Sequence, residues 1–126
     1  MKPVSAWRRL ALAFSLFMLS VAVAADLDAI PPAVRDIYRF PGGDWVGHFV
    51  LYGLMAFIGI RAFPRRAKMF SFSLPLAALA TACLSALEEL SQFWFPTRTP
   101  DWRDLSFGLL GILVVAWLSG QSEETR

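Results

Sequence analysis

The sequence predicts an all-α protein, a polytopic membrane bundle of four transmembrane helices that forms a single domain over residues 1–126. Two observations lead to this fold class. The chain is 56% hydrophobic and only 17% charged, well outside the proportions of soluble proteins. Its apolar residues also gather in four blocks, with the tryptophans, which favour membrane interfaces, at the block ends: Trp7, Trp45, Trp94, Trp102 and Trp117.

The four blocks give the expected spans, which are residues 10–25, 45–63, 73–95 and 102–118. A helix needs about 20 residues to cross a hydrocarbon core of roughly 30 Å. The last three blocks reach this length with help from flanking residues, and the first block is the shortest.

The first block also fits a second interpretation. Arg8 and Arg9 precede it and the small residues 22–25 end it, a pattern typical of a cleaved secretory signal peptide as well as of a first membrane helix. Cleavage would remove one span and leave the orientation of the others unchanged. Both alternatives stay open on the sequence alone.

The basic residues predict the orientation. Lysines and arginines divide eight to four if both termini are cytoplasmic, as the positive-inside rule expects. Segment 26–43 is then an outer loop with a short amphipathic stretch at 33–40, and 64–68 is a tight cytoplasmic turn. The cytoplasmic set is Lys2, Arg8, Arg9, Arg61, Arg65, Arg66, Lys68 and Arg126, and the outer set is Arg35, Arg39, Arg98 and Arg103.

The composition argues against several classes of function. A net charge of +2 is too small and too dispersed for a nucleic-acid-binding protein. Cys83 is the only cysteine, so neither an intrachain disulfide nor a thiolate metal cluster is expected. A single histidine without an HExxH motif leads us to predict neither a metal site nor a cofactor.

Polar residues interrupt the second and third blocks. Asp44, His48 and Tyr52 are spaced by four and therefore share one stripe of the second span. Ionisable groups at membrane depth are costly, and they usually face a protein interior or a watery cavity and carry function. The third span brings its own polar residues to the same membrane face, and the following loop adds more: Glu88, Glu89, Gln92, Arg98, Asp101, Arg103 and Asp104.

This cluster predicts an acid–base site near the outer headgroup boundary. A carboxylate from Asp44 or Glu89 would orient the His48 ring and raise its basicity. Arg98 can bind a phosphate or carboxylate through two parallel hydrogen bonds. Anionic ligands at that depth include phospholipids and lipid-linked cell-wall intermediates.

The same residues also have structural interpretations. Asp44 can anchor the start of its helix, and His48 can be a packing histidine. Asp101 and Asp104 have the spacing of an N-cap residue and its partner three positions later. Two glycines of the fourth span, Gly108 and Gly111, are expected to allow close helix packing.

Two segments resemble the signatures of the VanZ-like family of membrane proteins. Residues 44–52 resemble D-K-x-x-H-F-x-x-Y. Residues 89–92, 96–98 and 104–111 resemble E-x-x-Q, P-x-R and D-x-x-x-N-x-x-G in the same order. This chain departs from the pattern twice, with Trp45 in place of the lysine and Gly108 in place of the asparagine.

The resemblance implies which residues form the site. It favours Glu89 as the functional acid, whereas the helical period through residues 81, 85, 88 and 92 favours Glu88. The implied catalytic residues are Asp44, His48 and Glu89, and the implied ligand-binding residues are Tyr52, Gln92, Arg98 and Asp104.

The resemblance further implies a multi-pass protein of the bacterial inner membrane. Most VanZ-like proteins have no defined role, and the founding member is linked to low-level resistance to the glycopeptide teicoplanin. We therefore expect an outward-facing site that binds an anionic envelope lipid or cell-wall precursor, with membrane lipids as partners.

Three other functions remain open. The site can belong to a membrane hydrolase or transferase with His48 as base. It can belong to a proton-coupled carrier that uses Glu88 or Glu89, although carriers are usually built from larger repeats. The polar residues can also hold helices together in a structural, partner-binding subunit.

Overall fold

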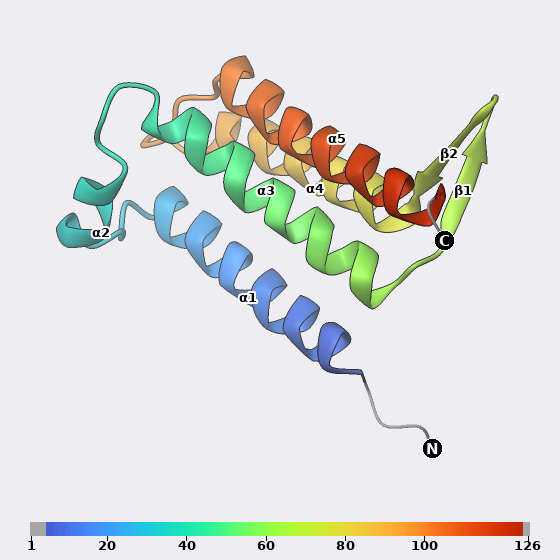
Figure 1. Cartoon of the computed structure of the whole chain (residues 1–126). Helices are drawn as coiled ribbons and strands as arrows, with labels where there is room; N and C mark the ends of the chain where they lie inside the picture. The colour runs from blue at the N-terminus through green and yellow to red at the C-terminus, as the bar shows by residue number, and fades with distance from the viewer. Residues whose placement is uncertain (1–4, 125–126) are drawn as a thin grey trace.

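The computed structural model describes residues 5–124, so Lys2 and Arg126, two of the expected cytoplasmic cations, lie outside the described residues. Four long helices dominate the fold, and successive long helices run in opposite directions (Figure 1). They are α1 (Ala6–Asp26), α3 (Gly43–Ala62), α4 (Leu76–Ser91) and α5 (Trp102–Glu124). Three shorter elements connect them: helix α2 (Pro32–Ile37), a hairpin of β1 (Arg66–Met69) and β2 (Phe72–Pro75), and the 3₁₀ turn η1 (Gln92–Trp94).

Three of these helices are long and apolar enough to cross a membrane. They are α1, α3 and the part of α5 from Trp102 to Gln121. The expected third span is shorter than the sequence predicted, because α4 has 16 residues and begins at Leu76 rather than at 73.

The hairpin explains the difference at α4. Its strands are antiparallel, with Arg66 opposite Pro75 and Met69 opposite Phe72, so the predicted tight turn at 64–68 is the first part of a longer excursion. The Arg66 side chain donates to the Ser73 hydroxyl at 2.9 Å and to the Ser73 carbonyl at 2.6 Å. Phe70 at the tip has a left-handed φ of 57° and is 99% exposed.

Helix α3 is the centre of the bundle and packs against α1, α4 and α5. Its most extensive contact is with α5, where the backbones approach closely at glycines. A Cβ on Gly111 would collide with the Phe49 carbonyl, and one on Gly108 would lie 3.2 Å from a ring carbon of Tyr52. The predicted packing role of both glycines is confirmed.

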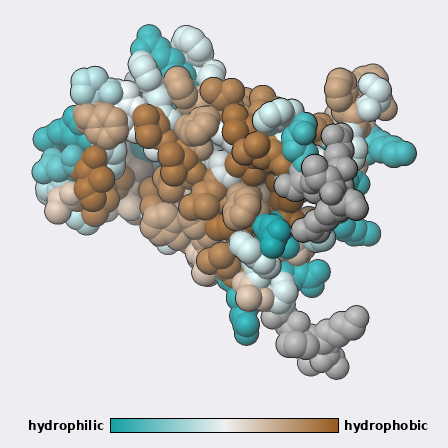
Figure 2. Space-filling model, viewed as in Figure 1, coloured by the Kyte–Doolittle hydropathy of each residue, from teal (hydrophilic) through white to brown (hydrophobic). Residues whose placement is uncertain are grey.

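The two ends of the bundle differ in charge. We call them the α2 end, which holds α2 and the starts of α3 and α5, and the hairpin end (Figure 1). Every acidic residue from Asp26 to Asp104 belongs to the α2 end. Between the ends, Figure 2 shows a band of hydrophobic side chains across the visible face. The hairpin end holds the cations Arg8, Arg9, Arg61, Arg65, Arg66 and Lys68.

Candidate functional site

A cavity of about 650 Å³ lies at the α2 end of the bundle. Its walls come from the second half of α1, from α2, from the start of α3, from the end of α4 with η1, and from the loop before α5 and the first turn of α5. Of the predicted site residues, all except Glu89 line it: Asp44, His48, Tyr52, Gln92, Arg98 and Asp104.

Helix α3 contributes its predicted polar stripe to this cavity. The helix begins after Gly42, whose left-handed φ of 79° suits a glycine, and Gly43 lies tightly against the Tyr38 carbonyl. Asp44 is exposed in the first turn, and the ring centroids of His48 and Tyr52 are 5.7 Å apart one turn further along. The stripe therefore runs from solvent into the buried core.

The acid that pairs with His48 is Asp104, rather than Asp44 or Glu89 as the sequence predicted. The His48 Nε2 atom lies 3.8 Å from Asp104 Oδ2, which is beyond hydrogen-bond distance. His48 Nδ1 and Asp104 Oδ1 are both buried without a hydrogen-bond partner. Buried polar atoms are normally satisfied, so these two atoms mark a place where a bound molecule or water can enter.

Arg98 joins three segments of the chain at the rim of the cavity. Its Nη2 atom donates to Glu88 Oε1 at 3.1 Å, and its Nε atom lies 3.6 Å from Asp26 Oδ1. The Thr97 hydroxyl donates to the Asp26 carbonyl at 3.1 Å. Asp26 was not predicted as a site residue, and its only signal in the sequence is that it is the first acid after the apolar block 10–25.

Glu89 lies behind the cavity and stabilises the start of α5. Glu89 is only 6% exposed, and its Oε1 atom accepts a hydrogen bond from the Asp101 backbone N–H at 2.6 Å. The Asp101 carboxylate accepts in turn from the Arg103 N–H at 2.9 Å, which confirms Asp101 as the N-cap. The expected partner role of Asp104 is wrong, because Glu89 from α4 supplies that acceptor and Asp104 faces His48.

Glu88 is the carboxylate of α4 that lines the cavity. Gln92 connects it to its neighbour, because Gln92 Nε2 donates to Glu88 Oε1 at 3.0 Å and to Glu89 Oε2 at 3.4 Å. Hydrogen bonds and ion pairs therefore connect α1, α4 and the start of α5 on one side of the cavity. The separate His48–Asp104 pair joins α3 to α5.

Comparisons with family models, with curated proteins and with solved structures found no match to this chain. The functional argument therefore depends on the chemistry of the cavity. Among the described residues, no group of three or more histidine, cysteine, aspartate or glutamate side chains is arranged to hold a metal ion. What the cavity offers is one imidazole–carboxylate pair, the further carboxylates of Asp44 and Glu88, one guanidinium and a set of apolar walls.

We expect the His48–Asp104 pair to be energetically coupled. In a double-mutant cycle of His48→Gln and Asp104→Asn, the coupling free energy should be about 1 kcal/mol, because the attraction of this half-buried imidazole–carboxylate pair is only partly screened by solvent. The cycle is read from the unfolding of purified protein in mixed micelles. A second cycle of His48→Gln with Asp101→Asn should be additive, and additivity in both cycles would contradict the pairing.

Proposed function

We propose that this protein is a VanZ-like, four-span protein of the bacterial inner membrane whose cavity faces outward and binds an anionic envelope lipid or a lipid-linked cell-wall precursor. The observation that carries the proposal is the composition of the cavity. One end presents Arg98, His48 and carboxylates, whereas the α1 and α2 walls present apolar residues such as Phe17, Val21 and Val34. A ligand that fills it needs a polar head attached to an apolar body.

The placement of the motif residues supports the VanZ-like assignment. The site residues that the resemblance implies, from Asp44 to Asp104, are distant in the sequence and line this one cavity apart from Glu89. The two departures lie away from it, since neither residue is part of the cavity wall. Trp45 stacks on Phe107 at 5.6 Å with Arg103 over its ring, and Gly108 packs against Tyr52 and Ser85.

Three features support four spans in the proposed orientation. Helix α4 and the turn η1 together are about 30 Å long, which matches the hydrocarbon core. The hairpin end carries the cations of the positive-inside rule, so it is the cytoplasmic end in this proposal. The contact of Asp26 with Arg98 makes α1 part of the site, which favours its retention over cleavage as a signal peptide.

The charges of the cavity narrow the ligand chemistry. Arg98 has five N–H donors, and its contacts with Glu88 and Asp26 use Nη2 and Nε, leaving Nη1 for a phosphate oxygen. Asp44 and Asp104 offer acceptors to the same space and would repel a dianion. The ligand is therefore a phosphodiester with a single negative charge, whose headgroup also carries hydroxyl or amine donors.

Native mass spectrometry of the protein purified in mild detergent tests this proposal. The wild-type protein should retain a phospholipid or polyprenyl phosphodiester. The Arg98→Gln variant should bind it about tenfold more weakly, a loss of about 1.4 kcal/mol, because glutamine keeps the polar bulk and removes the charge. Arg39→Gln is the matched control, since the Arg39 side chain is 70% exposed and its ion pair with Asp36, at 3.5 Å, lies outside the cavity. Equal retention in both variants would disprove the Arg98 site.

The His48–Asp104 pair favours a second candidate, a membrane hydrolase or transferase that acts on the bound lipid. In that case His48→Gln should keep lipid binding and lose turnover, because the imidazole would serve as the base. Incubation of the protein with extracted envelope lipids, followed by mass spectrometry of the products, distinguishes the candidates. Unchanged lipid pools would contradict the hydrolase or transferase and leave lipid binding as the single candidate function.

A further inference from the structure

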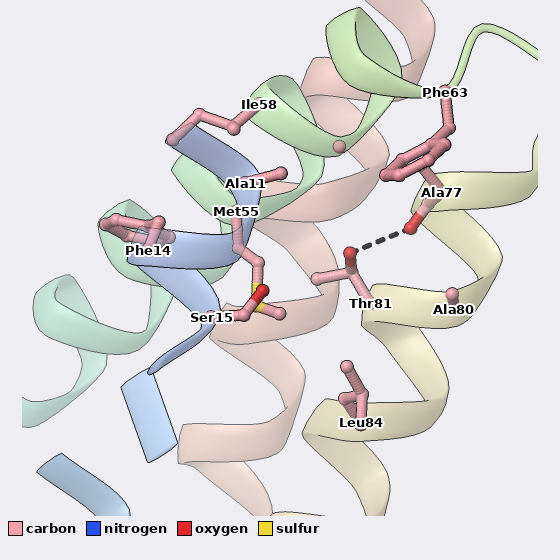
Figure 3. A pocket seen from close by; sticks show the side chains of 11 residues that line it. Ala11, Phe14, Ser15, Met55, Ile58, Phe63, Ala77, Ala80, Thr81 and Leu84 are labelled. Carbon is pink, nitrogen blue, oxygen red and sulfur yellow. Dashed lines mark hydrogen bonds between the residues drawn. The ribbon is translucent and has the colours of Figure 1, made fainter. Parts of the chain in front are cut away.

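A second, smaller cavity of about 180 Å³ lies between α1, α3 and α4, nearer the hairpin end (Figure 3). Side chains of α1 and α4 face each other across it, with Met55 of α3 between them. Apart from Ser15 and Thr81, its labelled side chains are apolar. The Thr81 hydroxyl donates a hydrogen bond to the Ala77 carbonyl at 2.8 Å, so its donor is satisfied without a polar partner in the cavity.

The two cavities follow the same face of each helix. On α4, the spacing of three or four residues from Ala77 through Thr81 and Leu84 continues to Glu88 and Gln92. On α3, it continues from His48 and Tyr52 in the polar cavity to Met55 and Gly59 in the apolar one. On α1, it continues from Ala11 and Phe14 to Met18 and Val21. The cavities are therefore two parts of one seam.

The seam has a lateral side as well as two ends. Within the described residues, α1 packs mainly against α3, and it has no contact of similar extent with α4. None of the described residues of α1 is fully buried. The surface between α1 and α4 is thus apolar, hollowed and next to the lipid of the proposed membrane.

We propose that this seam holds an acyl or polyprenyl chain of the lipid whose headgroup occupies the polar cavity. The inference rests on the proposed function and deepens it, because it names the ligand as a membrane-resident lipid rather than a soluble headgroup compound. Two observations select this occupant. The apolar cavity lies on the same faces of α1, α3 and α4 as the polar cavity. The stripe from Ala77 to Gln92 is also about 22 Å long, most of the roughly 30 Å hydrocarbon core.

The seam should select the acyl or polyprenyl chain by packing rather than by the hydrophobic effect. A chain that moves from bilayer to seam leaves one apolar environment for another, so little hydrophobic free energy is gained. Small residues on the walls, such as Ala11, Gly59, Ala77 and Ala80, provide the space for it. A larger side chain at one of these positions should therefore exclude the chain and leave the headgroup contacts in place.

The test compares two lipids with the same phosphatidylglycerol headgroup, one with palmitoyl and one with hexanoyl chains. Delipidated protein in detergent should bind the palmitoyl lipid about tenfold more tightly, which corresponds to about 1.4 kcal/mol. Ala80→Phe, whose side chain would fill the apolar cavity, should abolish this preference and leave binding of the hexanoyl lipid unchanged. Ala86→Phe is the matched control, because Ala86 is also an exposed alanine of α4 and lines neither cavity.

The outcomes separate this inference from the proposed function. Equal binding of both lipids, with no effect of Ala80→Phe, overturns the chain site and leaves the headgroup site standing. Failure of both lipids to bind wild-type protein overturns both. If Ala80→Phe does not fold, a photoreactive group near the chain end provides the second measurement on wild-type protein. Labelling around Thr81 that only headgroup-matched lipid displaces supports the seam, whereas displacement by any lipid overturns it.

Discussion

The Gly111→Leu variant is expected to lose about 3 kcal/mol of stability, the largest effect of any substitution proposed for this protein. The reason is the close approach of α5 to α3. A Cβ at position 111 would collide with the Phe49 carbonyl, and a backbone atom cannot move aside as a flexible side chain can. The Gly111 carbonyl also lies 3.3 Å from the place of a Cβ on Gly53, so the helices have no room to slide.

Unfolding of the purified variants by increasing fractions of dodecyl sulfate in mixed micelles measures this loss. Gly120→Leu is the matched control, because it makes the same substitution in the same helix at a position with nothing within 4 Å. It should change the stability by less than about 0.5 kcal/mol. If Gly111→Leu and Gly120→Leu unfold at the same detergent fraction, the contact between α3 and α5 is wrong.

Substitutions of the two neighbouring acids Glu88 and Glu89 should have different effects, one on lipid binding and the other on stability. Glu89→Ala is expected to lower stability by about 2 kcal/mol, because it leaves the Asp101 N–H at the start of α5 without its charged acceptor. Glu88→Gln should keep the fold and raise the affinity for an anionic lipid, because it removes a negative charge that occupies Arg98. Unfolding measurements combined with native mass spectrometry read both effects.

The two variants together also decide whether Glu88 or Glu89 is the functional acid, a question that the sequence left open. A structural Glu89 and a ligand-facing Glu88 require that only the first variant loses stability and only the second changes lipid binding. If Glu89→Ala remains as stable as the wild type and loses lipid binding, then Glu89 is the site acid, as the family resemblance implies.

The sequence predicted the part of the site that depends on local spacing. Asp44, His48 and Tyr52 recur every four residues, so any helix through them forms the stripe that lines the cavity. Antiparallel helices then bring the end of α4 to the start of α3, because short connections leave no other arrangement. Composition likewise predicted four spans, and three of the helices, α1, α3 and α5, are long and apolar enough to cross a membrane.

The remaining features depend on contacts that no periodicity encodes. Glu88 and Glu89 both fit a period of 3.6 residues, and only the hydrogen bond from Asp101 distinguishes them. Residues 73–75 of the strand Phe72–Pro75 fall within the predicted third span, because a short apolar run does not reveal its secondary structure. Asp26 belongs to the site because its carboxylate contacts Arg98, a loop residue far along the chain.

The seam along α1 and α4 has a consequence for how occupancy responds to concentration. A molecule that enters from the side never leaves the two-dimensional phase of the leaflet, so its supply is set by its mole fraction among the lipids and not by its aqueous concentration. Adding inert lipid or detergent should dilute it on the surface and empty the site, even when the total amount of ligand is constant. Under the proposed function, a scarce lipid would thus fill this protein only where it is locally enriched.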